Sequence, residues 1–293
     1  MLTLTFLGVG AAFAKRNFAS NALVEAWSGD PERSSGPDDN LLVDFGATGP
    51  LALHQLIRCP EFSYLQRDGA IRYEAIRNLF ITHLHNDHIG GLEELAICNA
   101  YACGVEKFGE CFKPKILSTA EILRNLWDHS LRGGLGAVRG RQAELADYFT
   151  VTPVAGGVDG PPGMVLLDRY ELRSFPTDHI QIHRKYDWPS RGLQFTDSQS
   201  GRSVVYTGDT RFDPVGLGRF FEKADLIFHE VQLEDHPDPV HTLLTELRAL
   251  PVDMRKKMIL YHYGDDWNKE VFGDVGKEFG GFARPGKRYE LFA

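Results

Sequence analysis

The sequence lacks any long run of apolar residues, and this absence excludes a membrane-spanning helix. Its first eight residues contain no basic cluster followed by an apolar stretch, so they differ from a secretory signal. Cysteine is scarce, with four in 293 residues and no Cys-x-x-Cys pair. These absences predict a soluble cytoplasmic protein, without membrane contact, whose cysteines are buried or half-buried thiols in a reducing compartment.

Clusters of basic charge are also missing. Lys and Arg number 32 against 40 Asp and Glu, which gives a net charge of -8 and an isoelectric point near 5.8. General attraction to polynucleotide needs clustered Lys and Arg, so the charge does not support RNA as a partner, and any RNA contact would be local. The Gly-rich basic stretch 132–141 is interpreted equally well as a mobile lid or as an ordinary loop.

The chain has enough apolar residues for a large core, since 43% of its residues are hydrophobic. It shows no tandem repeat and no linker-like segment, so we expect a single domain over residues 1–293. Short apolar runs predict strands at residues 2–7, 21–26, 41–45, 78–81, 114–117, 165–175, 193–196, 203–207, 226–228 and 258–261. Helices are expected at 51–58, 119–130 and 241–249, after Gly90 and after Trp267. The mixture of strands and helices predicts an α/β fold. Over residues 105–160 the sequence pattern predicts secondary structure least clearly.

The most informative feature present is a dense cluster of metal-binding side chains. His83, His85, Asp87 and His88 lie within six residues. Their imidazole and carboxylate groups suit zinc, manganese or iron. The i, i+2 spacing of His83 and His85 directs both rings to one side of an extended segment. The cluster follows a predicted strand and precedes a predicted helix, where open α/β sheets commonly place their sites.

The run from His83 to His88 resembles the His-x-His-x-Asp-His signature of the metallo-β-lactamase superfamily. Later segments resemble that family's other motifs in the same order: Thr5–Ala12, Leu41–Gly46, Thr177–His179, Tyr206–Thr210 and Leu260–His262. The resemblance extends along nearly the whole chain. It implies a four-layer αββα sandwich of two mixed β-sheets.

The same resemblance implies two metal sites with a shared ligand. His83, His85 and His179 would bind the first ion, Asp87, His88 and His262 the second, and Asp209 would bridge both. His179, Asp209 and His262 each end a strand-like apolar run, so all three could reach the same sheet edge. The implied cofactors are two divalent ions, zinc first, with manganese or iron as alternatives.

Further motifs narrow the branch of the superfamily. Asp209 stands where zinc β-lactamases have Cys, and His85 stands where flavo-diiron oxygen reductases have Glu. Residues 224–231, 240–242 and 189–195 are similar to elements of the ribonuclease Z group. The chain departs from that group at Val231-Gln232 and Thr242-Leu243, and we identify no tRNA-gripping arm. The resemblance therefore implies that this protein hydrolyses a phosphodiester, as ribonuclease Z or a small phosphodiesterase does. It does not imply tRNA processing.

The implied mechanism uses a metal-bridging hydroxide, because two ions lower the pKa of a shared water to about 7. Asp87 would orient that hydroxide. His241 is the candidate general acid, kept protonated by Glu230, and the alternative is an ordinary residue at a helix N-terminus. His229 is interpreted as structural.

Several residues are weaker candidates for substrate contact. They are His129 and His183, together with the aromatic residues Trp127, Tyr186 and Trp188, for which a place in the core is preferred over stacking on a base.

Two other functions remain open. The same site would also hydrolyse a carboxylic ester, thioester or lactone, because the hydroxide attacks acyl carbon equally well. A non-catalytic protein that binds or carries a cofactor on this fold is less favoured, since the chain retains all seven implied ligands. The expected partner is a phosphodiester or other small-molecule substrate, with a homodimer as a further possibility.

Overall fold

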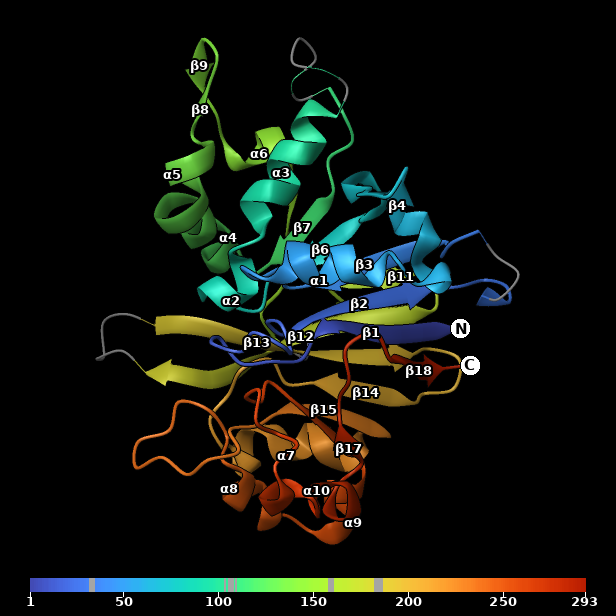
Figure 1. Ribbon diagram of the computed structural model, residues 1–293, viewed down its shortest axis with the longest axis vertical. Coiled ribbons are helices and arrows are strands. Elements are labelled where there is room, and N and C mark those ends of the chain that lie inside the picture. Colours follow the sequence, from blue (N-terminus) through green and yellow to red (C-terminus); the bar gives the residue numbers. More distant parts are fainter. Residues whose placement is uncertain (32–34, 103, 105–107, 109, 158–160, 182–186) are drawn as a thin grey trace.

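Two seven-stranded β-sheets lie face to face, and helices cover the outer face of each (Figure 1). The computed structural model describes all residues except 32–34, 103, 105–107, 109, 158–160 and 182–186. The predicted four-layer αββα sandwich is therefore confirmed. Among the described residues, no helix is long and apolar enough to cross a bilayer.

The first sheet has the order β10-β7-β6-β3-β2-β1-β18. Its strands are β1 (Leu2–Gly8), β2 (Asn21–Ala26), β3 (Asp39–Val43), β6 (Asn78–Phe80), β7 (Lys115–Ser118), β10 (Thr150–Pro153) and β18 (Arg288–Phe292). Strands β18, β1, β2 and β3 pair antiparallel, whereas β3, β6, β7 and β10 pair parallel. The sheet is therefore mixed, as predicted.

The second sheet has the order β11-β12-β13-β14-β15-β16-β17. Its strands are β11 (Met164–Leu166), β12 (Tyr170–Gln181), β13 (Asp187–Asp197), β14 (Ser203–Tyr206), β15 (Leu226–Glu230), β16 (Met258–Tyr261) and β17 (Gly281–Phe282). From β14 to β17 the pairing is parallel. The carboxyl ends of these strands therefore lie at one edge, where ligands from different strands can meet.

The helices divide between the two outer faces (Figure 1). Those over the first sheet are α1 (Gly49–Leu56), α2 (Asn86–Ile89), α3 (Leu92–Tyr101), α4 (Ala120–Leu126), α5 (Arg132–Leu135) and α6 (Leu145–Tyr148). Those over the second sheet are α7 (Pro214–Lys223), α8 (Leu244–Arg248), α9 (Val252–Lys256) and α10 (Val275–Glu278). Short 3-10 turns span Pro60–Leu65, Tyr73–Ala75 and Glu270–Phe272, and a π-helical turn spans Trp127–Leu131.

Alternation along the strands divides the apolar side chains between two cores. In β3, Leu41 and Val43 face the second sheet, while Leu42 faces the helices over the first sheet. Phe6 lies between the sheets, with its ring 5.4 Å from that of Phe228 and 5.3 Å from that of Tyr261. Each fully buried side chain of this size contributes about 1.5–3 kcal/mol. The sandwich core thus fixes the two sheet edges that carry the predicted ligands.

Several predicted elements differ from the structure. The strand expected at 165–175 is a hairpin of β11 and β12, because Leu167 and Asp168 have φ values of 52° and 53° and turn the chain. The helix expected from His241 begins only at Leu244. The helix expected after Trp267 is a 3-10 turn and the short α10.

The Gly-rich basic stretch forms α5 and a hairpin of β8 (Ala137–Val138) and β9 (Arg141–Gln142). Figure 1 places this hairpin at one end of the longest axis, well away from α2 and from the end of β12. Arg141 forms a bidentate ion pair with Asp147, at 2.7 and 2.8 Å. The position favours an ordinary surface loop over a lid.

A second small hairpin joins β4 (Gln66–Arg67) and β5 (Ala70–Ile71).

The cysteine prediction was wrong in part. Cys59 and Cys98 are free but exposed, so they are not buried thiols. Cys111 is disulfide-bonded. Cys103 lies outside the described residues.

Candidate metal centre

All seven predicted ligands converge where strands of both sheets end. His83 and His85 follow β6, and Asp87 and His88 lie in α2. On the second sheet, His179 lies in β12, Asp209 follows β14 and His262 follows β16. A bulge in the β12–β13 pairing, between Thr177 and Ile180, changes the direction of the His179 side chain.

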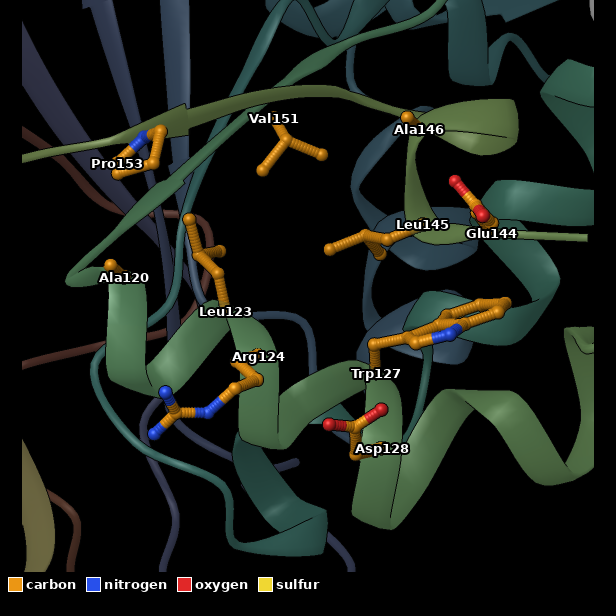
Figure 2. Close-up of a pocket in the computed structure, with 10 residues that line it drawn as sticks. All are labelled: Ala120, Leu123, Arg124, Trp127, Asp128, Glu144, Leu145, Ala146, Val151 and Pro153. Carbon is orange, nitrogen blue, oxygen red and sulfur yellow. The ribbon is translucent and has the colours of Figure 1, made fainter.

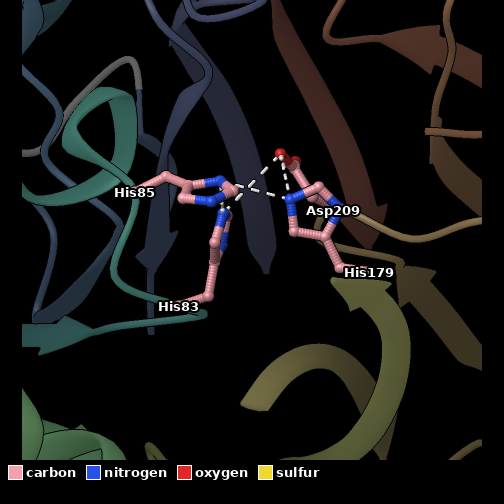
Figure 3. A group of neighbouring side chains, drawn as sticks. All are labelled: His83, His85, His179 and Asp209. Atoms are coloured by element: carbon pink, nitrogen blue, oxygen red, sulfur yellow. Dashed lines mark hydrogen bonds and ion pairs between the residues drawn. The ribbon is translucent and has the colours of Figure 1, made fainter. Parts of the chain in front are cut away.

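The first ligand group comprises His83, His85, His179 and Asp209, whose ligand atoms all lie within 4.8 Å of one another (Figure 3). His85 Nδ1 lies 3.0 Å from His83 Nε2 and 3.2 Å from His179 Nε2. Asp209 Oδ2 lies 3.8 and 3.9 Å from the same two Nε2 atoms. Atoms bound about 2.1 Å from one tetrahedral ion stand roughly 3–3.5 Å apart, so the spacing suits a single cation.

The second ligand group comprises Asp87, His88, His262 and again Asp209. Asp209 Oδ2 lies 3.3 Å from both His88 Nε2 and His262 Nε2. Asp87 Oδ2 lies 3.3 Å from His88 Nε2 and 4.0 Å from His262 Nε2. Because Asp209 belongs to both groups, two ions held here would share one carboxylate.

Three buried atoms in these groups lack a hydrogen-bond partner among the described residues. They are both carboxylate oxygens of Asp209 and Nε2 of His88. A buried, unpaired carboxylate costs several kcal/mol unless a cation compensates it. The donors are nitrogen and oxygen without thiolate, which suits zinc, manganese or iron. The residues present therefore fit two divalent ions.

The protonation states also favour cations. Burial lowers the pKa of His83 and His85, and it lowers the pKa of His179 and His262 to about 4. Burial would raise the pKa of Asp209, but His262 and His88 outweigh it and hold that pKa well below its usual range. Neutral imidazoles beside an ionised carboxylate are the forms that metals bind.

His88 differs from the other histidines. Burial alone would lower its pKa, but the carboxylates of Asp209, Asp87 and Asp44 outweigh that effect and raise it. A cation bound to His88 Nε2 would therefore displace a proton.

Asp44 is a functional residue whose role the sequence analysis did not assign. Its carboxylate lies 2.7 Å from His88 Nδ1 and accepts hydrogen bonds from the Thr82 backbone N–H (2.8 Å) and hydroxyl (2.7 Å). Metal-binding histidines commonly donate the second ring N–H to a carboxylate, which fixes the tautomer. Asp44 has φ of 60°, a conformation rare outside glycine and frequent at functional sites. The sequence did contain a signal for it, since Asp44 lies within the motif Leu41–Gly46.

His179 and His262 have positioning partners of their own. His179 Nδ1 donates to the Val240 carbonyl oxygen at 2.8 Å. His262 Nδ1 lies 3.2 Å from the Ser20 hydroxyl, and the His262 backbone N–H donates to the Val9 carbonyl at 2.7 Å. Val9 and Ser20, which lie near the N-terminus, therefore support His262, the ligand nearest the C-terminus.

A close backbone contact positions α2 and its two ligands. A Cβ atom at Gly46 would lie 1.7 Å from the Asp87 carbonyl oxygen, so only glycine fits without displacing α2. The neighbouring Phe45 backbone N–H donates to the His88 carbonyl at 2.7 Å. The segment that follows β3, with Asp44 and Gly46, therefore positions the second ligand group.

His241 lies over both ligand groups, with its ring centre 4.9 Å from those of His179 and His262. Its Nδ1 lies 3.3 Å from Glu230 Oε1, and its Nε2 has no hydrogen-bond partner among the described residues. Burial alone would lower the pKa of His241, but Glu230 outweighs it and raises that pKa to about 9.

Glu230 Oε1 also accepts hydrogen bonds from the backbone N–H groups of Thr210 and Thr242, both at 3.1 Å. Glu230 thus joins the Asp209 loop to the His241 segment. His229 points to the opposite side, with its ring 5.4 Å from that of Phe221, in line with the structural role predicted for it.

Two cavities of about 450 Å³ each lie on opposite sides of α4. One adjoins the first ligand group and is lined by His179, Trp188 and Arg191, among others. The other lies between α4, the π-helical turn and β10, and its lining is mainly apolar, with Leu123 and Trp127 projecting into it (Figure 2).

The weaker candidates have mixed outcomes. Trp127 is half-buried and packs against the core over the first sheet, as preferred, although it also lines a cavity. Trp188 is half-buried and lines the other cavity, so the preference for core was wrong there. His129 is exposed on the π-helical turn. His183 and Tyr186 lie outside the described residues.

The facing mixed sheets and the ligand groups at their edge define a metallo-β-lactamase fold. YhfI from Bacillus subtilis has this fold and aligns over 98% of both chains, with a TM-score of 0.63 and 19% identity. Yeast PDE1 aligns over 100% of this chain and 99% of its own, with a TM-score of 0.65 and 16% identity. The short form of human tRNase Z aligns over 99% and 100%, with a TM-score of 0.60 and 19% identity. The predicted metallo-β-lactamase fold is confirmed, and a ribonuclease Z and a phosphodiesterase are among the solved structures that share it.

Within this class, the chain belongs to the family described as Anti-Pycsar protein Apyc1, whose profile matches residues 2–289. The Apyc1 protein of Paenibacillus sp. (strain J14) is 34% identical over 267 residues, which cover 90% of each chain. That of Bacillus phage vB_BsuM-Goe3 is 31% identical over 278 residues, which cover 94% of this chain and 93% of the phage protein.

Proposed function

We propose that this protein hydrolyses a phosphodiester bond in a cyclic nucleotide, with two divalent ions held by the seven ligands. The observation that carries the proposal is Asp209, a buried carboxylate that both ligand groups share and whose oxygens have no hydrogen-bond partner among the described residues. His241, held by Glu230, lies directly over those groups. The family's name, Anti-Pycsar protein, is consistent with an enzyme that degrades a cyclic nucleotide.

The ligands would hold one ion through His83, His85 and His179, and the other through Asp87, His88 and His262. When bound, two such ions lower the pKa of a water molecule and stabilise negative charge on a phosphoryl group. Asp87 remains slightly accessible at 7% exposure, so its carboxylate can accept a hydrogen bond from the attacking water and orient it.

His241 supplies the proton that the leaving group needs. Hydrolysis forms a bond from the water oxygen to phosphorus and breaks the bond from phosphorus to a ribose oxygen. That ribose oxygen would leave as an alkoxide unless it gained a proton. Because the pKa of His241 is raised to about 9, its Nε2 carries a proton at pH 7 and can donate it.

The test is a substrate panel with protein reconstituted separately with zinc and with manganese. The panel contains the four 3′,5′-cyclic nucleotides, bis(p-nitrophenyl) phosphate and p-nitrophenyl acetate. We expect turnover of cyclic nucleotides by the wild type and its loss in Asp209→Asn. The matched control is Asp274→Asn, since Asp274 is an exposed carboxylate whose ion pair among the described residues is with the surface residue Lys277.

The ester alternative would be favoured by turnover of the acetate alone, and such a result would overturn the proposal. A content well below two ions per chain in fully loaded protein would favour the non-catalytic alternative. The single domain, the homodimer and the cytoplasmic location stay predictions. Light scattering of the purified protein would determine the oligomeric state.

A further inference from the structure

Arg191 is a buried cation without a carboxylate partner among the described residues. It is 6% exposed, and its Nη2 donates only to two neutral acceptors, the Gly156 carbonyl and the Ser174 hydroxyl (3.3 Å). Its Nε has no hydrogen-bond partner in the part of the chain that the structure describes. Burial alone accounts for the lowered pKa of Arg191, about 10, because no charged group opposes it. Arg191 is therefore an unsatisfied donor.

A buried charge of this kind is unfavourable for the folded chain. Replacing buried charges by apolar groups of similar size is often neutral or stabilising. Residues that break the ordinary rules of burial are concentrated at functional sites. Arg191 lines the 450 Å³ cavity beside the first ligand group, so a ligand in that cavity would meet its guanidinium.

Trp188 lines the same cavity, three residues earlier on β13. It is half-buried, and its ring centre lies 6.1 Å from that of His85, which belongs to the first ligand group. An aromatic ring with an accessible face stacks on nucleobases of any sequence. The cavity therefore combines a stacking surface with an arginine, next to a ligand group.

The cavity also has a suitable size and position. Its volume lies within the range of roughly 300–1,000 Å³ that small-molecule sites occupy. His179 forms part of both the cavity wall and the first ligand group. A phosphodiester held at the ligand groups would therefore place its nucleoside in this cavity.

We propose that the substrate's nucleobase binds in this cavity, stacked on Trp188, with Arg191 donating hydrogen bonds to its ring-nitrogen or carbonyl acceptors. This inference rests on the proposed function and assigns the specificity-determining residues of the same site. Arginine forms such bonds readily, because its planar fork of donors matches the acceptors on a base edge.

The kinetic test compares substrates with and without a base. Cyclic nucleotides carry one, whereas ethyl p-nitrophenyl phosphate does not. We expect Arg191→Met and Trp188→Leu each to raise KM for the cyclic nucleotides by about 10- to 100-fold. KM and kcat for ethyl p-nitrophenyl phosphate should stay within about twofold of wild type. Arg124→Met is the matched control, because Arg124 is an exposed arginine on α4 that lines the other cavity.

Thermal melting separates this role from a structural one. If Arg191 only anchored Gly156, Arg191→Met would lower Tm and reduce turnover of both substrate classes equally, which would overturn the inference. If it binds the base, Arg191→Met should keep or raise Tm, since an unpaired buried cation is removed. Trp188 is only half-buried, so Trp188→Leu keeps the test available if the arginine variant fails to fold.

Calorimetric binding makes the inference independent of turnover. AMP and CMP carry a base, whereas ribose 5-phosphate carries the sugar and the phosphate without a base. Wild type should bind the nucleotides about 10- to 100-fold more tightly than ribose 5-phosphate, and Arg191→Met should lose most of that difference. Equal binding of all three by wild type would overturn the base site, even if cyclic nucleotides were hydrolysed. Base-dependent binding without any hydrolysis would instead refute only the proposed function.

Discussion

The replacement Asp44→Asn should weaken the second ligand group selectively. Asp44 is fully buried, and its carboxylate holds His88 Nδ1 at 2.7 Å while Thr82 supplies two further hydrogen bonds. The amide has almost the same shape, so packing is retained. The asparagine side chain has one acceptor oxygen, so it cannot accept all three hydrogen bonds that the Asp44 carboxylate accepts from Thr82 and His88. Its NH2 group would face either Thr82 or the ring of His88.

The size of the effect follows from the lost bond. A hydrogen bond to a charged group is worth about 1.5–3 kcal/mol, which corresponds to roughly a 10- to 150-fold change in an equilibrium constant. Carboxylates that orient metal-binding histidines typically contribute about 10- to 100-fold in metal affinity. We therefore expect the second ion to bind about 10- to 100-fold more weakly in Asp44→Asn, with the first almost unchanged.

Competition titration of zinc-free protein with a chromophoric chelator measures both affinities. The control is Asp39→Asn, since Asp39 begins β3, the strand that directly precedes Asp44, and its side chain bonds to Asn40 and Asn78 among the described residues. Equal weakening of both ions would mean general damage to the fold. Unchanged affinity of the second ion would refute the role of Asp44 in orienting His88.

Three further predictions follow from the same structure. A Cβ at Gly46 would overlap the Asp87 carbonyl, so Gly46→Ala should lower the free energy of unfolding by about 1–3 kcal/mol in urea melts and reduce the metal content; an unchanged melt would contradict the close contact. His241→Ala should lower kcat on cyclic nucleotides by about 10²–10⁴-fold but change turnover of bis(p-nitrophenyl) phosphate little, since p-nitrophenolate leaves without a proton; equal losses would exclude general-acid catalysis. Hydrogen bonds from Arg169 lower the pKa of Asp197. The contribution of the Arg169–Asp197 pair to the free energy of unfolding is therefore fully present above about 3.9, the pKa of Asp197 in the unfolded chain. It is lost as the pH falls towards the lower pKa of Asp197 in the folded chain. Arg169→Gln should accordingly lower the unfolding free energy at pH 7 and less at pH 3, and a pH-independent difference would refute the assignment.

The gathering of the candidate ligands was predictable because its signals are local. His83, His85, Asp87 and His88 lie within one loop, and their spacing alone indicates a metal site. His179, Asp209 and His262 each lie in a strand or directly after one, so the predicted sheet brings them to a common edge. Apolar alternation also predicted β2 and β16 with the bounds that the structure has.

Contacts between distant segments could not be predicted in this way. Asp44 orients His88 across 44 residues, and Ser20 contacts His262 across 242, and neither pairing leaves a periodic pattern. Leu167 and Asp168 are ordinary residues for a strand, yet their positive φ values make the β11–β12 turn. The placing of Trp188 in a cavity instead of the core depends on the pairing of β12 with β13.

The most direct test of the account is a titration of metal-free protein with zinc or manganese, in which bound ions and phosphodiesterase turnover are measured on the same samples. Turnover of cyclic nucleotides should stay low up to one ion per chain and rise as the second binds, because Asp209 joins both ligand groups. In Asp209→Asn, the second rise should disappear. Full turnover with one ion per chain, or none with two, would contradict the two-ion phosphodiesterase proposed here.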